Sequence, residues 1–135
     1  NCGNIVDAVI GRLTGADPNA TSPANRDGSF DAIAARHGTA FTWGQSFQGA
    51  FDAVQRGGDG TTALVGIGYS SGTASHIVVM TNRNGQVAIT EAQDWGAGNP
   101  REVIGTPARA NQRYNSDGGS NIGVAVLPGH PGAGR

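Results

Sequence analysis

The stretch that decides the fold is SHIVVMTNRNGQVAITEAQ at residues 75–93, in which two apolar runs flank an Asn-Gly pair. Residues 77–80 and 87–89 are rich in β-branched side chains, a composition that favours strands. Asn84 and Gly85 tolerate the positive φ angles that a two-residue hairpin turn requires. The sequence therefore predicts an antiparallel hairpin in this stretch.

The segments on either side of the hairpin predict the rest of the domain. Apolar residues at helical spacing, closed by glycines, predict three helices at residues 5–13, 29–38 and 46–58, with Ser29 as a candidate N-cap. Apolar runs predict strands at residues 61–72 and 121–128, with a short strand near residues 102–104. Because helices precede strands, we expect an α+β fold in which N-terminal helices pack on a small antiparallel sheet.

Bulk composition limits both the architecture and the chemistry. A chain of 135 residues predicts one domain, at residues 1–128, followed by a flexible Gly/Pro tail at 129–135. A net charge of −1 argues against a nucleic-acid partner, and no apolar run is long enough to span a membrane. The absence of lysine excludes a Schiff-base lysine. The chain begins at Asn1, which predicts that it is part of a longer protein.

The single cysteine, Cys2, precedes the first predicted helix. Backbone N–H groups and the helix dipole at that position favour a thiolate, and the same amides can stabilise an oxyanion. The alternative is a small buried hydrophobic residue, which is how free cysteines often occur. One cysteine excludes an intramolecular disulfide, and the spacing of the three histidines predicts no metal site, so we expect neither metal nor cofactor.

His76 is the histidine best placed to serve a thiol, because it begins a predicted strand beside a glycine-containing loop. Pairing residues 77–80 with 87–90 would set Glu91 level with His76 and within reach as its orienting partner. Gln93 would share the face of Glu91, whereas Asp94 would point to the other face unless the strand has ended. A solvated acidic strand end is the alternative interpretation of these residues.

These segments resemble the papain-fold toxin domains, the glutamine-deamidase-like modules at the C-termini of bacterial polymorphic toxins. NCGNIVDAVIGRLTG resembles their opening block, and GTASHIVVMTNRNGQVAITEAQ resembles their block with a histidine-initiated strand. The resemblance implies a papain-like fold with Cys2 as nucleophile and His76 as general base. Glu91 takes the position of the usual aspartate and Gln93 that of the following glutamine. The longer side chain of Glu91 leaves Gln93 or Asp94 as alternative orienting groups.

The resemblance implies that Cys2 attacks the carboxamide of a target-protein glutamine and that water hydrolyses the resulting thioester. The same apparatus could cleave peptides, act as a peptidoglycan amidase or transfer the acyl group to an amine. A non-enzymatic alternative is a secreted binding module whose cysteine is linked to a lipid or a partner chain. A toxin of this kind implies a target protein, a cognate immunity protein, and secretion or delivery into a target cell as part of a larger toxin.

The remaining expectations concern the substrate groove. Trp43 and Trp95 are candidate groove walls, and a packing role is favoured for Trp43, whereas Trp95 follows the proposed orienting residues closely. Residues 95–119 are polar and predict a long loop that selects the target, apart from the short strand near residue 103.

Overall fold

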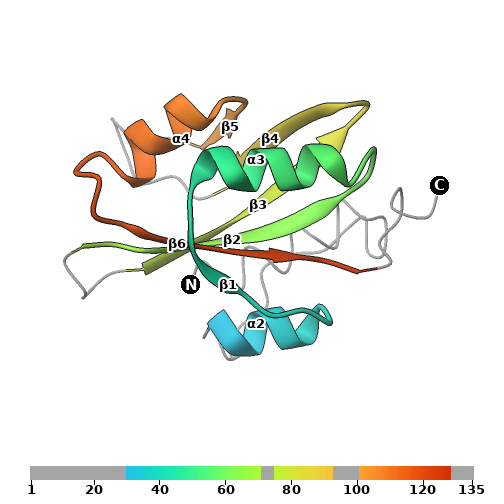
Figure 1. Ribbon diagram of the computed structural model, residues 1–135, viewed down its shortest axis with the longest axis horizontal. Coiled ribbons are helices and arrows are strands. Elements are labelled where there is room, and N and C mark those ends of the chain that lie inside the picture. Colours follow the sequence, from blue (N-terminus) through green and yellow to red (C-terminus); the bar gives the residue numbers. More distant parts are fainter. Residues whose placement is uncertain (1–29, 71–74, 93–100, 129–135) are drawn as a thin grey trace.

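The computed structural model describes residues 30–70, 75–92 and 101–128 (Figure 1). The helices in these residues are α2 (Phe30–Arg36), α3 (Phe47–Arg56) and α4 (Pro107–Tyr114). The strands are β1 (Thr42–Gln45), β2 (Thr62–Gly68), β3 (Ser75–Arg83), β4 (Gln86–Glu91), β5 (Glu102–Ile104) and β6 (Asn121–Val126). All six strands form one antiparallel sheet in the order β1-β6-β2-β3-β4-β5.

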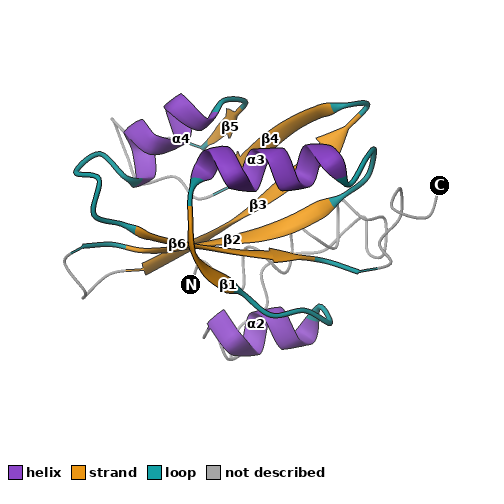
Figure 2. Cartoon of the chain, in the orientation of Figure 1, coloured by secondary structure: helices purple, strands orange, loops and turns teal. Residues whose placement is uncertain are grey.

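The sheet lies between two layers of helix, with α3 and α4 on one face and α2 on the other (Figure 2). Each face has its own apolar core because strand side chains alternate between the two faces. The core beneath α3 and α4 includes Val65, Val78 and Tyr114, and the core beneath α2 includes Leu64 and Val79. This arrangement confirms the predicted α+β class with helices packed on an antiparallel sheet.

The two described helices before the hairpin form where the sequence predicts them. After α2 the chain turns at Gly38, whose φ of 74° is the left-handed conformation that glycine accepts without strain. Thr39 N donates to Ala34 O over 3.0 Å, and this bond closes a Schellman C-cap. In α3 the hydroxyl of Ser46 accepts from Gly49 N, the arrangement of an N-cap.

The hairpin of β3 and β4 turns through Asn84 and Gly85, with φ angles of 55° and 86°. Both values are positive, as a type I′ turn requires, so the predicted turn is confirmed. Buried Asn82 joins this turn to α3, because its Nδ2 donates to Val54 O over 3.2 Å. Its Oδ1 accepts from Gly85 N over 2.9 Å. One amide therefore satisfies both the turn and a carbonyl at the end of α3.

Two elements differ from the sequence expectations. The prediction of a continuous loop after the short strand was wrong, because α4 begins within it at Pro107, behind the N-cap Thr106. Among its residues only Ala110, Arg113 and Tyr114 are buried, so its apolar stripe was too narrow to recognise. Strand β1 was not anticipated because all four of its residues are exposed.

Several expectations lie outside the described residues. They are the helix at residues 5–13, the N-cap role of Ser29 and the tail at 129–135. The domain boundary at residue 128 likewise stays a prediction. None of the helices in the described residues is long and apolar enough to cross a membrane.

Trp43 packs across two glycines that pair on adjacent strands, Gly66 of β2 and Gly123 of β6. Its ring lies 5.1 Å from that of Phe30 and 5.4 Å from that of Phe41, between centroids. The indole remains 36% exposed but is held by this aromatic cluster. Trp43 therefore has the packing role that the sequence favoured.

Replacing Gly123 with alanine is expected to lower the free energy of unfolding by about 1–3 kcal/mol, the usual cost of overpacking. The reason is that a Cβ at this position would lie 2.7 Å from Trp43 Cε3. Urea denaturation measures the effect. The matched control is Gly105→Ala, where a Cβ meets nothing within 4 Å. Equal stabilities of the two variants would contradict the prediction.

Candidate active site

His76 and Glu91 form a hydrogen-bonded pair inside the protein. His76 is the second residue of β3 and Glu91 is the last residue of β4, and the two are only 2% and 3% exposed. Nε2 of His76 lies 2.6 Å from Oε1 of Glu91. A buried carboxylate held against one imidazole nitrogen fixes the orientation of the ring.

The side chains of His76 and Glu91 meet, as the sequence predicted, but the predicted register was wrong. Arg83 pairs with Gln86 across the turn, so Val79 pairs with Thr90, and continuing the register sets Glu91 level with Val78. Glu91 therefore lies two residues from the position directly opposite His76 and is its diagonal neighbour. A slip of two residues keeps every side chain on its face, because strand side chains alternate with a period of two. The extra methylene of glutamate, compared with aspartate, helps to span that diagonal.

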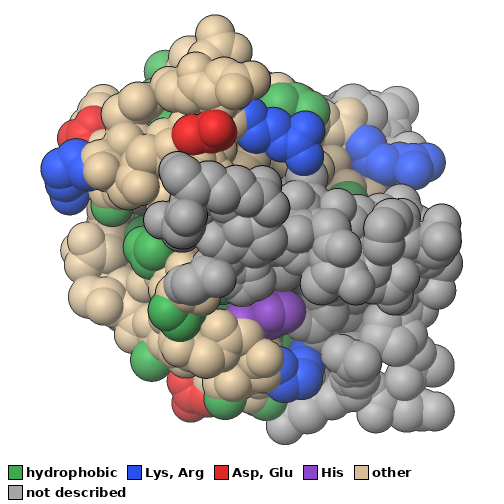
Figure 3. Space-filling view, turned by 90° about the vertical axis from the view of Figure 1, so that its right-hand side faces the viewer, with side chains coloured by type: hydrophobic (Ala, Val, Ile, Leu, Met, Phe, Trp, Pro, Cys, Tyr) green, Lys and Arg blue, Asp and Glu red, His purple; other side chains and the backbone are tan. Residues whose placement is uncertain are grey.

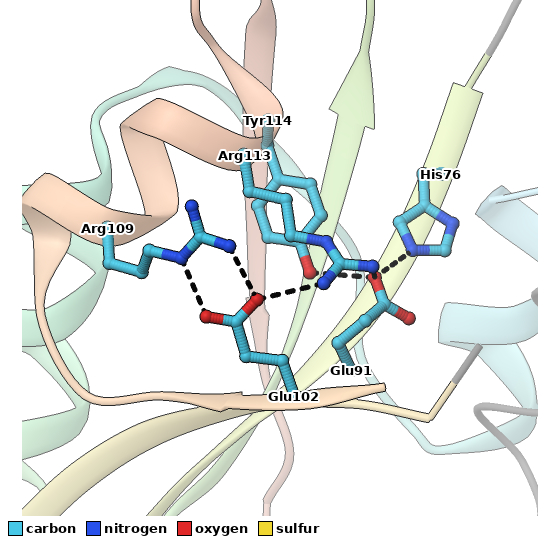
Figure 4. A network of polar contacts seen from close by, with 6 residues as sticks. All are labelled: His76, Glu91, Glu102, Arg109, Arg113 and Tyr114. Atoms are coloured by element: carbon cyan, nitrogen blue, oxygen red, sulfur yellow. Dashed lines mark hydrogen bonds and ion pairs between the residues drawn. The ribbon is translucent and has the colours of Figure 1, made fainter. Parts of the chain in front are cut away.

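Two residues of α4 also lie against Glu91 (Figure 4). Tyr114 Oη donates to the same Glu91 oxygen over 2.7 Å, and Arg113 Nη2 lies 4.0 Å from it. The Tyr114 ring packs 5.9 Å from the His76 ring, between centroids. Burial, and then the hydrogen bond to Glu91, raises the pKa of Tyr114 far above its ordinary value. The hydroxyl therefore remains a donor at every pH at which the protein would work.

A ladder of ion pairs leads from this carboxylate toward the surface. Arg113 Nη1 donates to Glu102 Oε1 over 2.9 Å, and Arg109 donates to both Glu102 oxygens over 2.6 and 2.8 Å. The hydrogen bond from Arg109, with a further contribution from Arg113, lowers the pKa of Glu102 from 4.5 to about 2 against the opposing effect of burial. Among the described residues of this ladder, Arg109 and Arg113 balance the charges of Glu91 and Glu102 when His76 is neutral.

Among the described residues on the face shown in Figure 3, a few acidic and basic side chains lie among more numerous uncharged ones, some of them next to a side chain of opposite charge. Two hollows in the described part of the chain, of about 560 and 400 Å³, are lined by neither His76 nor Glu91. Among the described residues, no group of three or more His, Cys, Asp or Glu side chains could hold a metal ion.

Of the predicted site residues, the structure brings His76 and Glu91 together. The nucleophile Cys2, the supporting residues Gln93 and Asp94, and the groove candidate Trp95 lie outside the described residues. Sequence reasoning did not find Tyr114 and Arg113. Only the Thr106-Pro107 helix start could have indicated that a helix, rather than a loop, follows β5.

The sequence matches the family model of papain fold toxin 1, glutamine deamidase, over residues 1–95. The chain belongs to this family of papain-fold toxins, and its class is that of a cysteine hydrolase. The match includes Cys2, His76 and Glu91.

Comparison of the sequence with curated proteins gives no match. Among solved structures, the chain is similar to the Pseudomonas avirulence protein AvrPphB, with 14% sequence identity and a TM-score of 0.41. The similarity covers 93% of this chain and 69% of that one.

The acid stability of the protein should depend on Glu102. Because folding lowers the pKa of Glu102 from 4.5 to about 2, its stabilising contribution is complete above pH 4.5 and is lost as the pH falls toward 2. The Glu102→Gln variant lacks this titration. Urea denaturation between pH 7 and pH 2 should therefore show a stability difference from wild type that shrinks on acidification. A difference independent of pH would refute the assignment.

Proposed function

We propose that this chain is a bacterial effector toxin that converts a glutamine of a target protein to glutamate through a thioester on Cys2. The observation that carries the proposal is the buried hydrogen bond between His76 and Glu91 in a chain of the glutamine-deamidase family. In this proposal Cys2 is the nucleophile, His76 the general acid and base, and Glu91 the residue that orients His76.

The first half of the reaction is acylation. The imidazole of His76 accepts the proton of the Cys2 thiol, and the thiolate attacks the side-chain carboxamide carbon of the glutamine. The C–N bond of the tetrahedral intermediate then breaks, and the imidazolium of His76 gives its proton to the departing ammonia. The product is a thioester between Cys2 and the glutamyl group.

The second half is hydrolysis of the thioester. His76 accepts a proton from water as the water attacks the carbonyl carbon, and it returns the proton to the sulfur as the C–S bond breaks. The target then carries a glutamate and Cys2 is restored. Through both halves the ionised Glu91 stabilises the imidazolium, since a positive charge on His76 faces a buried negative one.

The proposal includes two protein partners and a route. The target protein supplies the substrate glutamine, and a cognate immunity protein protects the producing cell. We also propose that the domain reaches the target cell as part of a larger toxin that is secreted or delivered.

Intact-mass analysis of candidate target proteins tests the reaction. Incubation with the wild type should add about one mass unit per modified glutamine, since an amide becomes an acid, and Cys2→Ala and His76→Ala should abolish the gain. Backbone fragments from the target would favour a protease instead. Release of peptides from cell walls would favour a peptidoglycan amidase. Unchanged activity of Cys2→Ala would overturn the proposed nucleophile.

Shortening Glu91 to aspartate should be costly even though both are carboxylates. The change withdraws the carboxylate by about 1.5 Å, one C–C bond, and a misplacement of that size can lower the rate about 100-fold. Glu102→Asp is the matched control, because it makes the same change in the carboxylate on the far side of Arg113 from Glu91. Steady-state kinetics should show the larger loss for Glu91→Asp. A larger loss for Glu102→Asp would contradict the diagonal geometry.

A further inference from the structure

Two donors meet at a single oxygen of Glu91. His76 Nε2 lies 2.6 Å and Tyr114 Oη 2.7 Å from Oε1, and the donors come from different elements, β3 and α4. Figure 4 shows the hydroxyl and the imidazole approaching this oxygen from separate directions. The position of the Glu91 carboxylate is therefore determined by α4 as well as by the strand that carries it.

The hydroxyl of Tyr114 is held rigidly in place. The residue is 1% exposed, ends α4, and packs against Phe47 with ring centroids 5.9 Å apart. A phenol that stays protonated has one O–H to donate, and here it donates to the carboxylate of Glu91. Tyr114 therefore acts as a fixed donor to Oε1 of Glu91.

Arg113 holds the same carboxylate through charge. Its side chain is fully buried, with Nη2 4.0 Å from Glu91 and Nη1 bonded to Glu102. Glu102 is in turn held by Arg109 in a bidentate pair. Because Glu102 holds the guanidinium of Arg113, this group cannot move with Glu91 if the Glu91 side chain changes rotamer. Arg113 therefore favours the ionised Glu91 carboxylate in the observed position.

These contacts determine which ring nitrogen of neutral His76 carries the hydrogen. An ionised carboxylate only accepts hydrogen bonds, so Nε2 of neutral His76 must carry the hydrogen, and Nδ1 then carries the lone pair. A general base for a thiol needs that lone pair on the nitrogen turned away from Glu91. Helix α4 lies beyond residues 1–95, the region that matches the family, so the match assigns no role to Tyr114 or Arg113.

We propose that Tyr114 and Arg113 are positioning residues, which hold Glu91 so that His76 keeps its hydrogen on Nε2 and presents Nδ1 as the base. The proposal rests on the proposed function for its catalytic consequence, but the arrangement of protons can be measured without any substrate. Neither residue touches the reacting atoms in this scheme. Both act through Glu91.

The first test is nitrogen NMR of the histidine-labelled full chain, at a pH where the imidazoles are neutral. Loss of a signal in a His76→Gln variant assigns the His76 resonances. We expect the wild type to show the hydrogen on Nε2, and the Tyr114→Phe variant to show a mixture of both tautomers. Wild-type His76 with its hydrogen on Nδ1 would overturn the proposal, whether or not any variant folds.

The second test is kinetic and uses Tyr114→Phe with Phe47→Leu as its control. Removing the hydroxyl should lower kcat about tenfold and leave KM within about twofold, because the lost hydrogen bond is to a charged group of the site. Phe47→Leu loosens packing against the same ring but keeps the hydroxyl and its bond to Glu91, so its kcat per folded molecule and its His76 tautomer should stay closer to the wild type than those of Tyr114→Phe. Equal losses of kcat in the two variants would reduce Tyr114 to a packing residue.

The two tests separate this inference from the proposed function. If no glutamine is deamidated but His76 carries its hydrogen on Nε2 and loses that preference in Tyr114→Phe, the positioning role stands and the reaction assigned to the site fails. If deamidation occurs and the tautomer is the same in both proteins, the positioning role fails and the reaction stands.

Discussion

The two-residue turn at Asn84 and Gly85 is the constraint on which the site depends. Because the turn pairs Arg83 with Gln86, it fixes the register of β3 and β4 and therefore the separation of His76 and Glu91 along the strands. Asn82 holds the turn against the end of α3 with a buried amide. The geometry of the site is thus set at the opposite end of the hairpin, several residues away from the histidine.

The register also gives a physical reason for the glutamate. Directly opposed residues of an antiparallel pair lie close together, whereas diagonal neighbours lie about 7–8 Å apart and need long side chains to meet. Glu91 lies on the diagonal from His76 and reaches it over 2.6 Å. Once it is extended in this way, the carboxylate also comes within reach of Tyr114 on α4. The longer side chain therefore connects the hairpin to a helix from the last third of the chain.

The second feature on which the site depends is the pairing of its buried charges. Glu91 and Arg113 are both buried, and an isolated charge in such a place would be strongly destabilising. The alternation of carboxylate and guanidinium from Glu91 to the half-exposed Arg109 places an opposite charge beside each of these buried groups and so lowers that penalty. The ladder allows a buried carboxylate to remain ionised beside an imidazole that gains and loses a proton.

The sequence by itself determined the hairpin, the helices α2 and α3, and the strands β2 and β6. It placed Glu91 within reach of His76 but left Gln93 and Asp94 as alternative partners. These elements follow from local signals, namely an Asn-Gly turn, glycine stops and alternating or helical apolar patterns. Only the tertiary structure decided the exact register, the edge strand β1, and the role of α4. The reason is that an exposed strand and a polar helix carry little apolar pattern, and that the contacts of Tyr114 and Arg113 join residues more than twenty positions from Glu91.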